Sequence, residues 1–443
     1  MRILLINDNY SHVGGAETYL LDLYQLLKEN KNNTYIFSMG KKEIKSTDVF
    51  VALETTAKKM LYESENFKDI SAWLLRKLIT KLNCFDAEEK VKIPLSFQKI
   101  ATKYQYIQIF GNYYIDTTIE DKLRDWINKT NPSIIHIHNN YKYPSSVYSS
   151  IKNLKIPIIK TVHDFGMICP TSRCIKPDFE ICEGSLGREC VEAGCISNRH
   201  YTLIKPANKI VSELEKSSVA LFITPSKILK KKMEEHGFNK VVHLPNFINP
   251  NKYCVGASAF ETGNILYIGS LENNKGVRYL IEAFPCVLKE FPDAKLNIAG
   301  SGTLRQCLEE RARQLGIRDH VLFQGKVSGE KVKELYQRAN VIVVPSIWIE
   351  NSPMVIYEAM ASGRPVIGSN IGGIPELICN GETGYLTEPR NPEDIAKKVI
   401  KIISDRNLTE KLGKTAREII LNEYSPEKHY EDITKIYKMV IKR

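Results

Sequence analysis

The sequence lacks three features that would place it in a class at once. Its 443 residues contain no apolar run of the roughly 20 residues that a membrane-spanning helix needs. They contain no Cys-x2-Cys pair, a common sign of a zinc site. No nucleic-acid recognition motif accompanies the net charge of +11. These absences argue against an integral membrane protein, a zinc finger and a nucleic-acid-binding protein.

The composition is that of a folded protein with room for two α/β domains. Hydrophobic residues make up 43% of the chain, which excludes disorder as its main character. The apolar start, residues 1–6, is too short for a signal peptide, and it leads into Asn7-Asp8-Asn9. It therefore predicts a first strand, and we expect a cytoplasmic protein.

The most informative stretch begins with an apolar run at 341–345, which predicts a buried strand. Residues 364–368 predict the next strand. Between them, Ser352 and Pro353 predict a helix start, since serine caps free N–H groups and proline suits the first helical position. Gly363 predicts the helix end. Strand, helix and strand in this order form a right-handed βαβ unit of a parallel sheet.

Two carboxylates flank this helix start. Glu350 lies in the loop beyond the carboxyl end of a strand, where open parallel sheets bind ligands, and Glu358 lies within the helix. The free N–H groups from Met354 onward form an anion site. A phosphate there, with a carboxylate on each side, suits a nucleotide-sugar, whose sugar and ribose hydroxyls would each meet one glutamate.

This stretch resembles the retaining glycosyltransferases of the GT-B fold, the "glycosyl transferases group 1" family. The family signature is two glutamates separated by seven residues, which Glu350 and Glu358 match, and the flanks 359–365 and 372–376 match as well. The resemblance implies an α/β fold with two Rossmann-like, doubly wound parallel-sheet domains that face a cleft. It also implies a C-terminal helix that crosses back onto the first domain.

The predicted boundaries follow from this resemblance. Residues 1–250 form an acceptor-side domain with a cysteine-rich insertion at about 165–200. A polar linker precedes the nucleotide-sugar domain at 260–424, and 425–443 form the returning helix. The alternative for that last helix is a position on the second domain.

The first domain offers two candidate residues near the sugar. Gly15 belongs to a Gly-Gly loop after the first strand, where glycines allow close backbone approach. The strand at 133–138 sends His136 and His138 to one face. The resemblance places Gly15 between sugar and acceptor, and His138 beside the transferred sugar. The strand at 157–162 leads to His163 and Asp164, for which the sequence predicts no role.

The second domain supplies the donor-binding candidates. The resemblance implies that Lys275 binds the donor diphosphate and that Val327 lies in the segment that frames the nucleobase. It also implies an arginine at the position where this chain has Ser270. The serine offers one neutral hydrogen bond in place of the charged, forked guanidinium group of arginine.

Five cysteines crowd the insertion after His163 and Asp164. A tetrahedral zinc site, free or redox-active thiols, and disulfides all remain open interpretations, although cytosolic chains favour thiols or metal. The candidate ligands of a structural metal are Cys169, Cys174, Cys182, Cys190 and Cys195.

The charge is uneven along the chain. Residues 1–250 hold 35 Lys and Arg against 27 Asp and Glu, which favours attraction to an anionic membrane surface. Residues 71–82 predict a basic amphipathic helix that either packs on the surface or lies in a membrane interface. We therefore expect a cytoplasmic protein, with peripheral attachment to the inner membrane face as the alternative.

The resemblance implies a hexosyltransferase-type enzyme that moves a sugar from a UDP- or GDP-sugar to a glycan or lipid-linked acceptor, with retention. No cofactor is expected, and catalysis should be metal-independent because no Asp-x-Asp pair is present. Two alternatives stay open. One is a nucleotide-sugar epimerase or phosphorylase on the same fold, and the other is a non-catalytic nucleotide-sugar-binding partner, which Ser270 favours.

Overall fold

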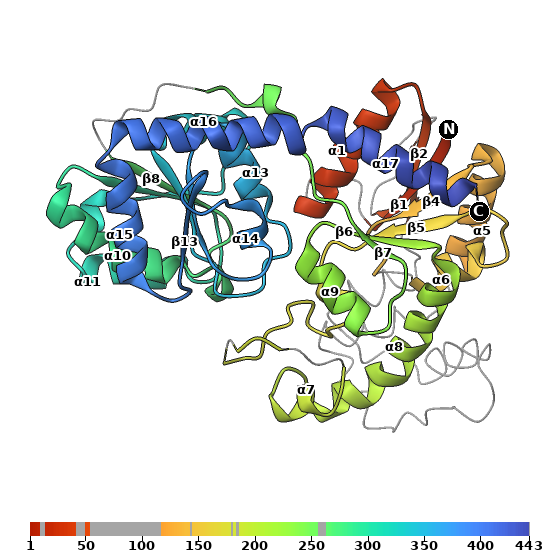
Figure 1. Ribbon diagram of the computed structural model, residues 1–443. Coiled ribbons are helices and arrows are strands. Elements are labelled where there is room, and N and C mark those ends of the chain that lie inside the picture. Colours follow the sequence, from red (N-terminus) through yellow and green to blue (C-terminus); the bar gives the residue numbers. More distant parts are fainter. Residues whose placement is uncertain are drawn as a thin grey trace.

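The computed structural model describes residues 1–8, 14–40, 49–53, 117–141, 144–178, 180–182, 186–255 and 263–442. Within these residues the chain forms two β-sheets, one of seven strands and one of six, and every pairing between named strands is parallel. Helices cover the sheets, and the two domains lie side by side in Figure 1. This architecture confirms the predicted α/β fold with two doubly wound domains.

The N-terminal sheet has the strand order β3-β2-β1-β4-β5-β6-β7. The order reverses between β1 and β4, so the loops after these two strands lie at the switch point where open parallel sheets bind ligands. Its strands are β1 (Arg2–Asn7), β2 (Asn33–Gly40), β3 (Val49–Leu53), β4 (Ile134–Ile137), β5 (Ile158–Thr161), β6 (Leu221–Thr224) and β7 (Val241–His243). The helices of this half are α1 (Gly15–Glu29), α5 (Thr117–Thr130), α6 (Pro144–Ile151), α7 (Glu189–Glu192), α8 (Asn198–Ser218) and α9 (Lys227–Glu235).

The C-terminal sheet has the order β10-β9-β8-β11-β12-β13, with its own switch point between β8 and β11. Its strands are β8 (Asn264–Ile268), β9 (Lys295–Ala299), β10 (Val321–Gly325), β11 (Val341–Val344), β12 (Val366–Ser369) and β13 (Gly384–Thr387). Its helices are α10 (Val277–Glu290), α11 (Arg305–Gln314), α12 (Glu330–Arg338), α13 (Met354–Ala361), α14 (Ile374–Leu377), α15 (Pro392–Ile403) and α16 (Arg406–Glu423).

Apolar residues on both faces of the central strands build the cores. Along β1, Leu4 and Ile6 join one buried cluster, whereas Ile3 and Leu5 join the cluster on the opposite face. This alternation follows from the two-residue period of a strand. Covered on both faces, such strands read as continuous β-branched runs, which is why the sequence predicted them closely.

The last helix, α17 (Pro426–Ile441), crosses from the second domain to the first, as the sequence predicted (Figure 1). Ser425 caps it by accepting a hydrogen bond from the backbone N–H of Lys428. Ile433 and Tyr437 are fully buried in the cluster that also contains Ile3 and Leu5. The helix thus ties the C-terminal domain to the N-terminal sheet by apolar packing.

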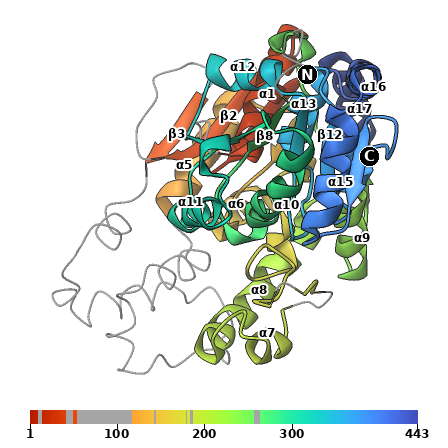
Figure 2. The same ribbon diagram turned by 90° about the vertical axis from the view of Figure 1, so that its left-hand side faces the viewer.

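The part of the insertion around α7 lies away from both sheets. In Figure 2, α7 and the neighbouring end of α8 lie below the rest of the molecule. This part carries its own small apolar cluster around Cys190, Ile196 and Ile204. The predicted amphipathic helix at 71–82 lies outside the described residues.

Candidate active site between the two domains

Two loops at the C-terminal switch point bring Lys275 and Glu350 together. Lys275 ends a short 3-10 turn after β8, and Glu350 lies in the loop after β11. The Lys275 Nζ donates to Glu350 Oε1 at 2.7 Å, and Ser346 Oγ donates to the same oxygen at 2.7 Å. The Lys275 ammonium also lies 4.7 Å from the centre of the Trp348 ring. The sequence named Lys275 and Glu350 separately, and the fold makes them an ion pair.

A glycine allows these two loops to touch. Gly276, which follows Lys275, has a φ of 66°, in the left-handed region. A Cβ atom there would lie 1.9 Å from the backbone oxygen of Pro345. The backbone N–H of Ile347 donates to Asn274 at 2.9 Å, which holds the loops in register. Any other residue at 276 would push Lys275 away from Glu350.

The helix start beside Glu350 differs from the prediction in one respect. The first helical residue of α13 is Met354, and Pro353 is the N-cap, with an extended ψ of 115°. Ser352 therefore lies too far from the first turn to cap it, and its hydroxyl pairs with the Tyr357 hydroxyl at 2.9 Å. No side chain caps this helix, which leaves its first N–H groups for an anion.

Glu358 lies farther along α13 and is already hydrogen-bonded. Its Oε2 accepts from the Tyr336 hydroxyl at 2.7 Å. Burial raises the pKa of Glu358 above its usual range, and the hydrogen bonds from Tyr336 and Tyr253 oppose that rise. Val327 and Met354 pack in the apolar cluster that contains Tyr336. The predicted ribose and nucleobase residues thus share one neighbourhood.

Ser270, which replaces the expected arginine, is exposed. Its backbone oxygen accepts a hydrogen bond from the Tyr267 hydroxyl at 2.8 Å. The serine therefore offers only a neutral hydroxyl at the end of β8.

The N-terminal domain lies close to these C-terminal residues, which form one wall of the candidate site. A Cβ atom built on Gly15, the first residue of α1, would lie 3.5 Å from Met354 Cγ. Ile349, which precedes Glu350, is buried in the N-terminal apolar core together with Phe165. The Gly-Gly loop of one domain and the Glu350 loop of the other therefore face each other.

Two residues in or beside the loop that carries Glu350 bond directly to the N-terminal domain. Asn351 Nδ2 donates to the backbone oxygen of His163 at 2.7 Å, and Asn351 Oδ1 accepts from the Ser226 hydroxyl. The Glu376 carboxylate accepts from the backbone N–H groups of Lys227 at 2.7 Å and Ile228 at 2.9 Å. It thereby caps the start of α9 from the opposite domain.

Three histidines form the N-terminal wall of the candidate site. They are His136, His138 and His163, and we call them the histidine wall. His136 and His138 lie on one face of β4, with ring centres 4.2 Å apart. His136 bonds to the Tyr437 hydroxyl at 2.8 Å and to the Thr161 hydroxyl at 2.7 Å. His138 Nδ1 lies 3.0 Å from His163 Nε2. Burial holds the pKa of His136 and His138 well below the usual range and lowers that of His163 to about 4. This wall is therefore neutral.

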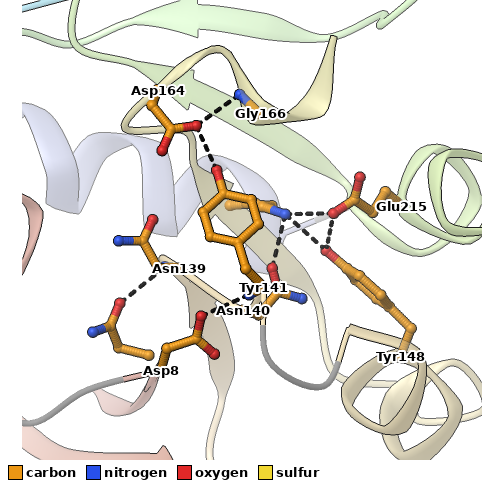
Figure 3. A network of polar contacts seen from close by, with 10 residues as sticks. Asp8, Asn139, Asn140, Tyr141, Tyr148, Asp164, Gly166 and Glu215 are labelled. Carbon is orange, nitrogen blue, oxygen red and sulfur yellow. Dashed lines mark hydrogen bonds and ion pairs between the residues drawn. The ribbon is translucent and has the colours of Figure 1, made fainter. Parts of the chain in front are cut away.

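A buried polar network joins β5, α6, α8 and the chain beyond β4 (Figure 3). Lys160, in the middle of β5, donates to Glu215 of α8 and to Asn140 Oδ1 at 2.9 Å. Tyr148 donates to the same Glu215 oxygen at 3.2 Å.

A second set of bonds in Figure 3 fixes the chain beyond β4 and β5. Tyr141 donates its hydroxyl to Asp164 at 2.6 Å and its backbone N–H to Asp8 at 2.7 Å. The backbone N–H of Gly166 donates to the same Asp164 oxygen at 2.7 Å. These bonds tie the carboxyl ends of β1, β4 and β5 into one rigid edge.

Comparison with known proteins agrees with this geometry. The profile described as "Glycosyl transferases group 1" matches residues 257–419, and the profile "Glycosyltransferase Family 4" matches residues 92–252. The two matches follow one another along the chain, one in each domain. The second domain of this chain is therefore a glycosyl transferases group 1 domain.

Solved structures with the same GT-B arrangement cover nearly the whole chain. HepE of Anabaena in complex with UDP aligns with a TM-score of 0.67 at 15% identity, over 99% of this chain and 100% of that one. Sucrose-phosphate synthase from Thermosynechococcus elongatus aligns with a TM-score of 0.67 at 17% identity, over 99% and 98%. At such identities the likeness concerns the fold.

Curated proteins are similar to this chain over parts of their length. An uncharacterized glycosyltransferase of Methanocaldococcus jannaschii is 36% identical over 49% of this chain and 60% of its own length. Glycogen synthase of Mycobacterium tuberculosis is 31% identical over 42% of this chain and 46% of its own length. N-acetyl-alpha-D-glucosaminyl L-malate synthase of Bacillus anthracis is 26% identical over 79% and 88%. The chain thus spans about half the length of the first curated relatives it matches.

The cysteine-rich insertion packs against two apolar clusters, and the structural metal proposed for it stays a prediction. The described residues contain no group of three or more His, Cys, Asp or Glu side chains that could hold a metal. Two of the cysteines join the main N-terminal core, two others lie in or against the small cluster near α7, and none of the five forms a disulfide. The five predicted ligands are Cys169, Cys174, Cys182, Cys190 and Cys195.

The two cysteines of the main core form a thiol pair. The backbone N–H of Cys174 donates to Cys169 Sγ at 3.4 Å. A hydrogen bond from the Cys174 thiol lowers the pKa of Cys169 to about 5, and the same bond raises the pKa of Cys174. This geometry favours the interpretation as free thiols.

Sequence reasoning missed several residues that join the two walls. His163, Asn351 and Glu376 were visible in the family-like motifs, but no local pattern assigns them partners. Lys160 did carry a signal, because a lysine within an apolar strand needs a buried partner. Across the described residues, no helix is long and apolar enough to cross a membrane.

Proposed function

We propose that this chain is a retaining glycosyltransferase that moves a sugar from a nucleotide-diphosphate sugar to an acceptor hydroxyl. One observation carries the proposal. The Lys275–Glu350 pair lies beside the uncapped start of α13, and Gly15 of the opposite domain lies against Met354 at that start. A cation, an anion-binding helix end and a carboxylate thus meet where two domains meet.

The donor would lie with its diphosphate at the start of α13. The first N–H groups of the helix and the Lys275 ammonium would stabilise the negative charge of the leaving diphosphate. Glu350 would orient the sugar hydroxyls and favour the positive charge of an oxocarbenium-like transition state. Glu358, positioned by Tyr336, would bind the ribose hydroxyls. Ser270 would add one neutral hydrogen bond to the diphosphate.

The reaction balances without a protein nucleophile or a metal. The bond between the anomeric carbon and the donor oxygen breaks, and a bond from the same carbon to the acceptor oxygen forms on the same face. The acceptor proton passes to an oxygen of the leaving diphosphate. In this scheme Lys275 supplies the positive charge that a metal ion would otherwise provide, so we propose metal-independent catalysis.

The substrates are proposed by class. UDP occupies the Anabaena neighbour, and another structure of that protein holds UDP-glucose, so a UDP-sugar is the first donor to test and a GDP-sugar the second. The acceptor would be a glycan or a lipid-linked glycan of surface polysaccharide synthesis. The basic N-terminal half would draw a cytoplasmic enzyme of this kind to the anionic inner face of a membrane.

The test combines binding with turnover. A thermal-shift screen against UDP- and GDP-sugars identifies the donor, and release of the nucleoside diphosphate with an acceptor panel measures transfer. Glu350→Gln should lower kcat by about 100-fold or more, because it removes charge aimed at the transition state. The matched control is Glu388→Gln, an exposed carboxylate of the same domain, which should keep full activity. NMR of the product's anomeric carbon reads the stereochemical outcome.

The same experiment separates the alternatives. Full transfer by a folded Glu350→Gln variant would sink the assignment of Glu350. Isomerised donor without an acceptor would identify an epimerase. Donor binding without any turnover would identify a non-catalytic nucleotide-sugar-binding partner. The neutral Ser270, in place of a charged arginine, favours this alternative.

A further inference from the structure

His138 is a buried histidine with one unused ring nitrogen. Its side chain follows β4 and is 1% exposed. Nδ1 lies 3.0 Å from His163 Nε2, whereas Nε2 has no hydrogen-bond partner within the described part of the chain. Buried polar atoms are nearly always satisfied, because leaving one without a partner costs free energy. The unused nitrogen therefore points to a ligand that supplies the missing partner.

The partner of Nδ1 decides what this free nitrogen can do. The His138 and His163 rings lie 5.3 Å apart and within 20° of parallel, and the Tyr19 ring meets His163 edge-on at 5.4 Å. Burial keeps both imidazoles neutral at neutral pH, so only one of the two facing nitrogens carries a proton. The state of His138 Nδ1 then dictates whether Nε2 donates or accepts.

His163 is itself held by the loop after β11 that carries Glu350 and Asn351. We call it the donor loop, because the proposed function places the donor there. Its backbone oxygen accepts from Asn351 Nδ2 at 2.7 Å, and Asn351 directly follows Glu350. The other end of the Asn351 amide accepts from the Ser226 hydroxyl, so the amide cannot turn freely. The backbone N–H of Gly373 donates to the Glu350 backbone oxygen at 2.7 Å, which seats this loop.

We propose that His163 is a positioning residue that fixes the tautomer of His138, and that Asn351 ties His163 to the donor loop. With the two domains in contact, His138 presents one defined ring nitrogen to a hydroxyl of the transferred sugar. The identity of this ligand rests on the proposed function, whereas the tautomer of His138 does not depend on it.

Nitrogen NMR of the full chain with ¹⁵N-labelled histidine tests the tautomer directly. The His138 signals are identified by their loss in His138→Gln. The wild type should show one tautomer of His138. His163→Phe keeps a ring but removes the hydrogen bond, and should give a mixture of both tautomers. A single, unchanged tautomer in His163→Phe would overturn the proposal.

Kinetics separate positioning from a merely structural role. In His163→Phe, kcat should fall about tenfold, the worth of one well-placed hydrogen bond, while the donor KM changes less than about twofold. His163→Gln should recover most of kcat. His320→Gln, a histidine of the other domain bonded to a backbone oxygen, is the control and should be unaffected. A parallel change in kcat, donor KM and unfolding midpoint, with no rescue by glutamine, would overturn the positioning role.

Asn351→Ala provides a second route if His163→Phe does not fold. It leaves the His163 ring in place but frees its backbone, and should also produce mixed tautomers and a lower kcat. One fixed tautomer in this variant would overturn the link to the donor loop. Failure of the wild type to transfer any sugar would count against the proposed function alone, because the NMR result stands without turnover.

Discussion

Two lysine–glutamate pairs, one in each domain, differ in exposure. The side chains of Lys160 and Glu215 are 3% and 6% exposed, whereas those of Lys275 and Glu350 are 25% and 9% exposed. The first pair is buried beneath the N-terminal sheet edge, and Lys160 donates to Asn140, Tyr148 and Glu215 of its own domain. The second lies at a switch point, where a ligand can reach the lysine. The same chemistry thus stabilises the fold in one domain and is available to a substrate in the other.

The two walls differ in charge as well. Neutral histidines form the N-terminal wall, and the C-terminal wall carries the Lys275–Glu350 pair. A sugar can lie against neutral imidazoles, while its diphosphate needs a cation and a helix start. The difference fits the proposed roles of the first domain on the acceptor side and of the second domain in donor binding.

The largest effect should come from breaking the buried pair. Lys160→Met leaves the Glu215 charge buried without its cation, which should cost about 3–5 kcal/mol of unfolding free energy. Urea unfolding measures it. The control, Lys155→Met, changes an exposed lysine of the same domain and should be nearly silent. A loss below about 1 kcal/mol would show that the pair does not hold the N-terminal edge together.

A fall in pH should have the next largest effect, because it favours protonation of the buried histidines and so lowers the free energy of unfolding. Burial lowers the pKa of His163 to about 4, against about 6.5 in the unfolded chain. It also lowers to about 3 the pKa of His429, a buried histidine of α17 that bonds to the Tyr19 hydroxyl. Between the folded and the unfolded pKa values, the unfolded state binds more protons than the folded state. The free energy of unfolding should therefore fall as the pH drops from about 6.5 towards about 4.

One carboxylate opposes this trend. Burial raises the pKa of Glu358, so its contribution to the unfolding free energy falls as the pH rises above its ordinary value. The histidines should decide the sign of the slope, because several buried histidines act in one direction and Glu358 alone acts in the other. Urea unfolding across pH 4.5–7 measures the slope, and His163→Phe should make it shallower. An identical slope in that variant would contradict the neutral state of His163.

Breaking the second pair should change binding rather than folding. Lys275→Met removes the cation proposed to hold the diphosphate, so the affinity for the donor should fall about 10- to 100-fold, as for a lost charged hydrogen bond. Isothermal titration with UDP-sugar measures it. Lys289→Met, an exposed lysine on α10, should bind normally. Equal affinities in the two variants would remove Lys275 from the donor site.

The smallest effect concerns the contact between the walls. Glu376→Gln keeps the shape but weakens the cap that Glu376 places on α9, which should cost about 1 kcal/mol. The expected signs are a slightly lower unfolding midpoint and a larger radius of gyration by small-angle scattering. Glu382→Gln, an exposed carboxylate nearby, is the control. An unchanged radius in Glu376→Gln would show that this cap does not help to close the domains.

The sequence anticipated most of what lies within a single βαβ unit. The strand at 341–344, the helix end at Gly363 and the placement of Glu350 beside a helix start all follow from periodicity and capping chemistry over a few residues. The helix boundary shifted by one residue, so Ser352 lost its predicted role as cap, because a proline in extended conformation lies before the first turn.

The sequence by itself therefore determined the fold, the C-terminal wall and the candidate donor residues, since these depend on short spacings and on the alternation of buried strands. Only the tertiary structure decided that Asn351 holds His163, 188 residues away, and that Lys160 meets Glu215 across 55 residues. Such contacts depend on strand order and on how two domains meet, and neither leaves a periodic trace in the chain.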